Sequence, residues 1–128
     1  KKNLFKIKKD SLETIILTDG RSITQRLKLK SLGLNNFKSM ISEEYNDKKP
    51  SLKRFKIIMK NIPANNYIYI GDNTNKDFLA PNKLKWLTIG IIDKNHLNIH
   101  KQNFQKDKKY LPKIWIKSLS DLYSLKKM

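Results

Sequence analysis

Short apolar runs alternate along the chain with stretches in which apolar residues recur at helical spacing. The runs end at polar or glycine-containing turns such as Thr18-Asp19-Gly20 and Gly71-Asp72-Asn73. Continuous apolar runs of four to seven residues are typical of strands that are buried on both faces of a parallel sheet. We therefore predict five strands, at residues 14–17, 37–41, 66–70, 86–92 and 114–116.

The intervening stretches predict helices. Residues 22–34 form the first, with Gly33 as its stop and an apolar face made of Ile23, Leu27, Leu32 and Leu34. Pro50 is expected to open the second, which runs through Phe55 and Ile58. Shorter helices are predicted at 76–84 and at 119–126, the last capped by Ser118 or Ser120.

Strands that alternate with helices indicate βαβ units and a parallel sheet. The fold class predicted here is therefore α/β, a three-layer Rossmann-like domain with a mainly parallel sheet. A chain of 128 residues is long enough for one hydrophobic core, so we expect a single domain over 1–128. Residues 1–12 are expected to be a lead-in, and 93–113 an irregular segment.

Composition narrows the function classes. The net charge of +17 suggests an anionic partner, but of the 28 basic residues only Arg21, Arg26 and Arg54 are arginine, and the 25 lysines are spread along the chain. Because dedicated nucleic-acid binders favour arginine and clustered aromatics, we expect no nucleic-acid partner. The absence of cysteine excludes disulfide, thiolate and zinc-ribbon chemistry and fits a cytoplasmic protein. No apolar run is long enough for a membrane helix, so no membrane partner is expected.

We look for candidate functional residues directly after the predicted strands, because ligands of open parallel sheets bind beyond the carboxyl ends of the strands. Thr18 and Asp19 offer a hydroxyl and a backbone N–H for an anion, or a simple helix cap. Lys49 offers a positive charge, although one lysine among 25 is ordinarily a surface residue. Asp72, at the end of a buried strand, suits Mg²⁺, and Asp77 orients neighbours or only places charge near a helix start.

In order and spacing, these residues resemble three motifs of the haloacid dehalogenase (HAD) superfamily of phosphohydrolases, across residues 13–120. Residues 15–21 and the following 25–34 look like the second motif, and 41–44 with Lys49-Pro50-Ser51 look like the third. Residues 69–80, which contain Gly71-Asp72 and Asp77, look like the fourth.

The resemblance implies a Mg²⁺-dependent phosphatase or phosphotransferase that acts on a phosphorylated small molecule. Thr18 and the backbone N–H of Asp19 would hold the phosphoryl group, and Lys49 would neutralise its charge. Asp72 would bind Mg²⁺, and Asp77 would support Lys49 or a metal-bound water. The resemblance thus predicts that Lys49 lies within salt-bridge reach of Asp72 or Asp77.

One departure from the superfamily concerns its first motif, Asp-x-Asp-x-Thr/Val, which supplies the nucleophile. Residues 1–10 contain no such pattern, and reading Thr18-Asp19 as this motif would make Leu17 the nucleophile. We therefore expect the C-terminal part of a HAD-like core, without the nucleophile strand and the cap. The nucleophile strand would lie between the strands at 66–71 and 13–18, so the missing N-terminal segment of the same protein is an expected partner. The alternatives are a non-catalytic module of the same fold and a nucleic-acid-binding protein.

Overall fold

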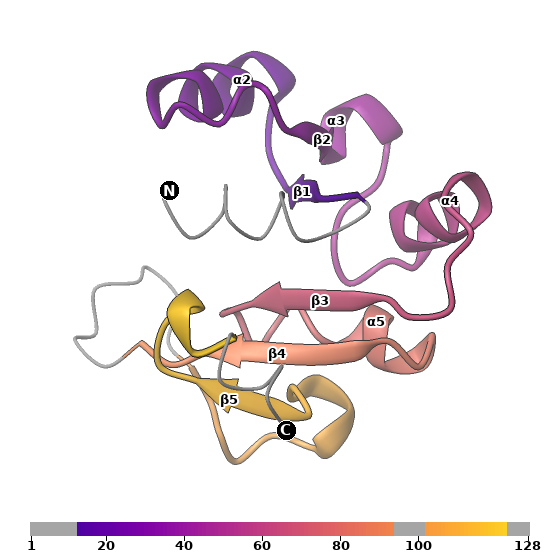
Figure 1. Cartoon of the computed structure of the whole chain (residues 1–128), viewed down its shortest axis with the longest axis vertical. Helices are drawn as coiled ribbons and strands as arrows, with labels where there is room; N and C mark the ends of the chain where they lie inside the picture. The colour runs from indigo at the N-terminus through magenta and orange to yellow at the C-terminus, as the bar shows by residue number, and fades with distance from the viewer. Residues whose placement is uncertain (1–12, 94–101, 123–128) are drawn as a thin grey trace. The chain divides into compact units, whose positions relative to one another are not determined.

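The computed structural model describes residues 13–93 and 102–122 (Figure 1). The described residues form two compact units, which lie within residues 1–48 and 49–128. In the described part of the chain, five strands form two parallel sheets, β1-β2 in the first unit and β3-β4-β5 in the second. The prediction of a parallel α/β fold is therefore confirmed, whereas the expectation of a single domain stays a prediction.

The first unit is a βαβ unit that ends in a short helix. Strand β1 (Ile15–Thr18) pairs in parallel with β2 (Lys38–Ile41), so that Thr18 lies opposite Ile41. Helix α2 (Ser22–Ser31) connects them, and α3 (Ser42–Tyr45) follows β2 without a break. The core of the unit consists of Leu29, Leu34 and Phe37, with Ile16 packed against it. Both strands thus end at one edge of this sheet.

Helix α2 is shorter than predicted, and it buries a different face. It ends at Ser31, and Gly33 adopts a positive φ of 71°, a conformation that glycine reaches without the cost of a Cβ. Ile23 and Leu27 are 78% and 63% exposed, so the predicted apolar face is wrong at these positions. Leu29 is instead the buried residue of the helix.

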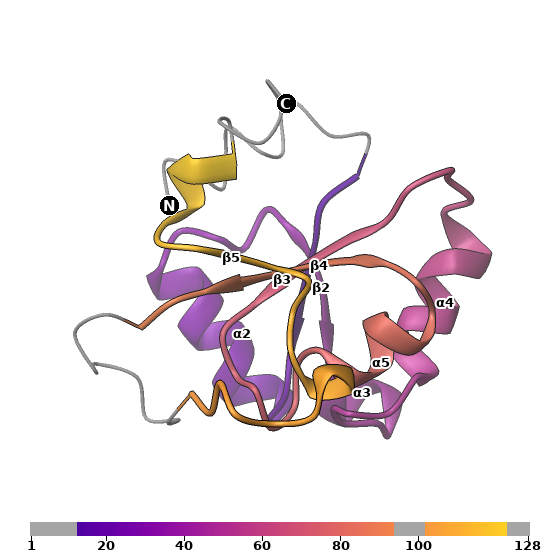
Figure 2. The same ribbon diagram turned by 90° about the horizontal axis from the view of Figure 1, so that it is seen from below.

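The second unit contains a three-stranded parallel sheet in the order β3-β4-β5. The chain can be followed from β3 through α5 to β4 in Figure 1 and, turned by 90°, in Figure 2. Gly71 at the end of β3 lies opposite Gly90 of β4. The elements of the unit are α4 (Lys53–Asn61), β3 (Ile68–Gly71), α5 (Leu79–Lys83), β4 (Leu87–Ile91), η1 (Lys108–Tyr110), β5 (Ile114–Ile116) and η2 (Leu119–Asp121).

Aromatic rings fill the core of the second unit and hold Tyr69 in place. The Tyr69 ring makes edge-to-face contacts with Phe55 of α4 at a centroid distance of 5.3 Å and with Phe78 at 6.4 Å. Phe55 also contacts Trp86 at 5.3 Å. Phe55 and Phe78 are 1% and 0% exposed. Because rings in such contacts have little freedom, the position of the Tyr69 hydroxyl is set by the core.

The predicted strands are all present, but several helix starts differ. Helix α4 begins at Lys53, not at Pro50, so Lys49 lies in the turn before the helix. Helix α5 begins at Leu79, so Asp77 precedes the helix and is not in its first turn. Of the last predicted helix, the described residues contain η2 and the α-helical residue Leu122 that follows it, and 123–128 lie outside them, as do 94–101.

Among the helices that the structure describes, none is long and apolar enough to span a membrane.

Candidate functional site

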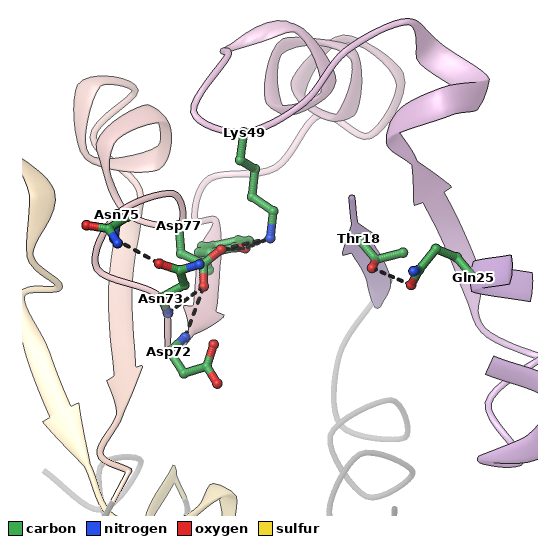
Figure 3. Close-up of polar contacts among 8 residues, drawn as sticks. Thr18, Gln25, Lys49, Asp72, Asn73, Asn75 and Asp77 are labelled. Carbon is green, nitrogen blue, oxygen red and sulfur yellow. Dashed lines mark hydrogen bonds and ion pairs between the residues drawn. The ribbon is translucent and has the colours of Figure 1, made fainter. Parts of the chain in front are cut away.

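Three side chains of the second unit meet at the carboxyl end of β3 (Figure 3). The Lys49 Nζ donates to Asp77 Oδ1 at 2.8 Å and to the Tyr69 hydroxyl at 3.1 Å. The Tyr69 hydroxyl in turn donates to the same Asp77 oxygen at 3.2 Å. The side chains of Lys49 and Asp77 are only 12% and 6% exposed. The expected ion pair between Lys49 and one of the two carboxylates is therefore present, and its partner is Asp77.

The cluster keeps Lys49 charged and Tyr69 neutral. Burial alone lowers the pKa of Lys49, but its interactions with Tyr69 and Asp77 outweigh burial and raise this pKa above its ordinary value. Burial raises the pKa of Tyr69, and this effect exceeds the opposing influence of the Lys49 charge. At neutral pH the site therefore holds a permanent ammonium group beside a hydroxyl that keeps its proton.

The second oxygen of Asp77 organises the loop that follows β3. Asp77 Oδ2 accepts hydrogen bonds from the backbone N–H groups of Asp72 at 3.0 Å and Asn73 at 2.9 Å. The loop closes on itself as well, because the Asn73 side chain accepts from the Asn75 N–H at 2.9 Å. Asp77 thus links Lys49 to the backbone of Asp72.

The side chain of Asp72 has a different direction from that of Asp77. In Figure 3 the Asp72 carboxylate points away from Lys49, while its N–H faces Asp77. An aspartate oxygen is a ligand that Mg²⁺ accepts. Within residues 13–93 and 102–122, however, no three His, Cys, Asp or Glu side chains gather at one point. Asp72 therefore fits Mg²⁺ in chemistry, but it needs further oxygen ligands to hold the ion.

The first unit places a hydroxyl and an exposed turn at the end of β1. Thr18 Oγ1 donates to Gln25 Oε1 at 3.0 Å (Figure 3). The turn is held by Ser42 at the end of β2, since its Oγ accepts from the Gly20 N–H at 2.8 Å and donates to the Gly20 carbonyl at 3.2 Å. Gly20 has a φ of 142°, which a residue with a Cβ would adopt only with strain. Thr18 and Asp19 thus lie at a turn fixed on the neighbouring strand.

Two glutamates of α3 bind the start of α2. Glu43 Oε1 accepts from the Ser22 N–H at 2.9 Å, which satisfies one of the N–H groups left open at a helix start. Glu44 accepts from the Ser22 hydroxyl and takes two hydrogen bonds from the Arg26 guanidinium, at 2.6 and 2.8 Å. The hydrogen bonds to Arg26 and Ser22 lower the pKa of Glu44. In this structure both glutamates therefore hold the turn after β1.

The structure brings Lys49, Asp72 and Asp77 together within the second unit, while Thr18 and Asp19 belong to the first. The roles assigned to these five residues stay predictions. Sequence reasoning missed Tyr69, which looks like any core residue of a strand. It also gave no role to Gly71, although a glycine directly before Asp72 at a strand end was a signal of close packing. A Cβ at Gly71 would lie 2.6 Å from Asp77 Oδ2.

Comparisons with known proteins agree with this fold. No family model matches the chain. The glyceraldehyde 3-phosphate phosphatase of Methanocaldococcus jannaschii is 34% identical over 95 residues, which are 71% of this chain and 42% of that protein. The chain therefore spans less than half of the length of this curated relative.

Solved structures match nearly the whole chain. The HAD-hydrolase YfnB of Bacillus subtilis, in a magnesium-bound form, matches 98% of this chain and 54% of its own, with a TM-score of 0.76 and 24% identity. A HAD phosphatase of Thermococcus onnurineus matches 97% and 54%, with a TM-score of 0.77 and 19% identity. A 2-haloacid dehalogenase of Pseudomonas syringae matches 95% and 49%, with a TM-score of 0.68 and 18% identity. These structures show that the chain has the α/β fold of HAD hydrolases, and the archaeal phosphatase is similar to it in sequence over 71% of the chain.

Proposed function

We propose that this chain is the phosphoryl-binding and metal-binding part of a Mg²⁺-dependent HAD-type phosphatase or phosphotransferase. The observation that carries the proposal is the buried cluster of Lys49, Tyr69 and Asp77 at the carboxyl end of a parallel strand. The proposal is also supported by a relative, a phosphatase whose sequence matches 71% of the chain. The substrate class that we propose is a phosphorylated small molecule.

In this proposal Lys49 neutralises negative charge on the phosphoryl group. Its raised pKa keeps the ammonium protonated, and its hydrogen bonds to Tyr69 and Asp77 hold it in one place. A charge that is already positioned in a mostly buried site stabilises an anionic transition state without reorganisation at the moment of reaction. Asp77 and Tyr69 position Lys49, and neither is assigned contact with the substrate.

Asp72 is proposed as one Mg²⁺ ligand. When bound, the ion would neutralise charge on the phosphoryl oxygens. The chain's own contribution is the fixed backbone of Asp72, whose N–H is bound by Asp77. Since one carboxylate and water bind Mg²⁺ weakly, further oxygen ligands are expected from residues beyond Asp72.

Thr18 and the N–H of Asp19 are proposed to bind the phosphoryl oxygens. The Thr18 hydroxyl donates to Gln25 in this structure, so it would have to rotate away from Gln25 to donate to a phosphate. A hydroxyl rotates at low cost, and Gln25 would act as a resting partner.

The nucleophile is proposed to come from an N-terminal segment of the same protein that carries the Asp-x-Asp pattern. This segment would also supply a strand, since in the described residues β1 pairs only with β2 and β3 only with β4. Covalent catalysis needs an attacking carboxylate, and none of the five site residues is assigned that role. The 128-residue chain alone is therefore expected to have little or no activity.

The test compares hydrolysis of p-nitrophenyl phosphate by the purified 128-residue chain and by the complete protein, with and without Mg²⁺. We expect turnover only by the complete protein with Mg²⁺, and a loss of about a hundredfold or more in Asp72→Asn. Robust turnover by the chain alone, abolished by Asp72→Asn, would contradict the expectation that the nucleophile lies outside these 128 residues. A complete protein that neither hydrolyses phosphate esters nor binds vanadate would support the non-catalytic module, and steeply salt-dependent DNA binding would support a nucleic-acid binder.

A further inference from the structure

The side chain of Gln102 joins the ends of two neighbouring strands. Its Nε2 donates to the carbonyl oxygens of Asp72 at 2.9 Å and Ile91 at 2.7 Å. Its Oε1 accepts from the N–H of Asp93 at 2.9 Å. Asp72 follows β3, and Ile91 is the last residue of β4. One amide therefore uses both donor hydrogens and its acceptor on backbone groups at the carboxyl end of the sheet.

Gln102 completes the fixation of the Asp72 backbone. The N–H of Asp72 is bound by Asp77 Oδ2 at 3.0 Å, and its carbonyl oxygen is bound by Gln102 at 2.9 Å. The bond to Asp77 holds the peptide plane before the Asp72 Cα. The plane after it is held on its carbonyl side by Gln102 and on its N–H side by the bond from Asn73 to Asp77 Oδ2 at 2.9 Å. Since the direction of the Cα–Cβ bond follows from the two planes, they set the direction in which the carboxylate leaves the backbone.

A neighbouring contact ties the same two segments together. The N–H of Asn103 donates to Thr74 Oγ1 at 3.0 Å, and Thr74 is 1% exposed. Residues 102 and 103 are thus attached to the loop after β3 at two points, thirty residues away in sequence. A contact that only satisfied the end of β4 would need the bonds to Ile91 and Asp93, but not the bond to Asp72.

We propose that Gln102 is a positioning residue that fixes Asp72 in the direction needed to bind a divalent cation. This inference rests on the proposed function for the identity of the ligand, and on the hydrogen bonds of Gln102 for the positioning. Gln102 itself is assigned no contact with metal or substrate.

Two variants separate positioning from general stability. Gln102→Glu keeps the size of the side chain and an acceptor for the Asp93 N–H, but it loses both donors and places a negative charge against two carbonyl oxygens. Gln102→Ala removes all three hydrogen bonds. Gln105→Ala is the matched control, because Gln105 is an exposed glutamine three residues away. All comparisons are made at a temperature at which circular dichroism shows each variant folded.

The first measurement is amide hydrogen exchange, which needs no activity. We expect both Gln102 variants to speed exchange of the Asp72 and Asn73 amides by about tenfold or more, while the buried Ile89 amide keeps its protection. The Gln105→Ala control should leave all three amides unchanged. The positioning role would be overturned if the Asp72 and Asn73 amides of folded Gln102→Glu exchanged at the wild-type rate. It would also be overturned if exchange of the Ile89 amide increased by the same factor as theirs.

The second measurement is the Mg²⁺ concentration for half-maximal hydrolysis of p-nitrophenyl phosphate by the complete protein. We expect it to rise about tenfold in both Gln102 variants, as for other residues that orient a metal ligand, with KM for the ester changed less than about twofold. An unchanged Mg²⁺ requirement in both variants overturns the inference. A wild-type protein without activity, together with the expected amide exchange, would overturn the proposed function and leave the positioning of Asp72 standing.

Discussion

Gly71 and Asp77 approach each other so closely that a Cβ on Gly71 would lie 2.6 Å from Asp77 Oδ2. Real Cβ atoms do not approach an oxygen this closely, so glycine at position 71 is a condition for the position of the Asp77 carboxylate. The same oxygen accepts the N–H groups of Asp72 and Asn73. The absence of a side chain at the end of β3 is thus required for the geometry of the site.

Gly71→Ala is expected to destabilise the protein by about 2 kcal/mol, because the added methyl group forces the Asp77 carboxylate away from its partners. Urea unfolding followed by fluorescence measures the change. The control is a double-mutant cycle with Asp77→Ala, which removes the two closest clashing atoms, Oδ2 and Cγ, and leaves only Cβ at 3.0 Å, so that Gly71→Ala should cost less there. Equal costs in both backgrounds would show that the clash is absorbed elsewhere.

Lys49→Met is expected to lower the free energy of unfolding by about 3 kcal/mol, because it leaves the Asp77 carboxylate buried without its cation. In the complete protein, vanadate affinity should fall about tenfold or more through loss of a charged donor. Lys56→Met is the matched control, since Lys56 is an exposed lysine of α4. Similar losses in the two variants would contradict the special role of Lys49.

Tyr69→Phe removes the hydroxyl that contacts both Lys49 and Asp77 while it keeps the ring between Phe55 and Phe78. We expect a cost of about 1 kcal/mol in unfolding free energy. We also expect weaker vanadate binding by the complete protein, since Lys49 loses its hydrogen bond to the Tyr69 hydroxyl.

Tyr67→Phe is the comparison for this variant. The Tyr67 hydroxyl also makes two hydrogen bonds, to the Ile62 carbonyl at 2.6 Å and from the Ala64 N–H at 2.9 Å, and neither partner belongs to the cluster of Lys49, Tyr69 and Asp77. Tyr67→Phe should lower the free energy of unfolding by a similar amount and leave vanadate binding unchanged. Equal vanadate affinities in the two variants would mean that the Tyr69 hydroxyl does not position Lys49.

The pair between Glu44 and Arg26 predicts a pH dependence in the first unit. Because the folded state lowers the pKa of Glu44 from 4.5, its contribution to stability is present above pH 4.5 and is lost as the pH falls through the lowered value. Side-chain ¹³C NMR of the carboxyl group measures this pKa. The stability difference between wild type and Glu44→Gln should shrink as the pH falls below 4.5, and a constant difference would exclude the linkage.

The sequence alone was sufficient to place the five strands. Their apolar runs are continuous because both faces of a parallel strand are buried, and polar turns mark their ends. The contact between Lys49 and Asp77 was predicted from the resemblance to HAD motifs, and it is present at 2.8 Å. Local patterns were poorer guides to helix starts, since Pro50 precedes α4 by three residues.

Only the tertiary structure decided which ordinary residues serve the site. Tyr69 has the sequence signature of a core strand residue, and its hydroxyl reaches Lys49 only because Phe55 and Phe78 fix its ring. Gln102 lies thirty residues from Asp72, and nothing in its neighbourhood along the chain indicates that its amide bridges β3 and β4. The physical reason is that hydrogen-bond partners far apart in sequence depend on how the strands pack side by side, which local hydrophobic periodicity does not encode.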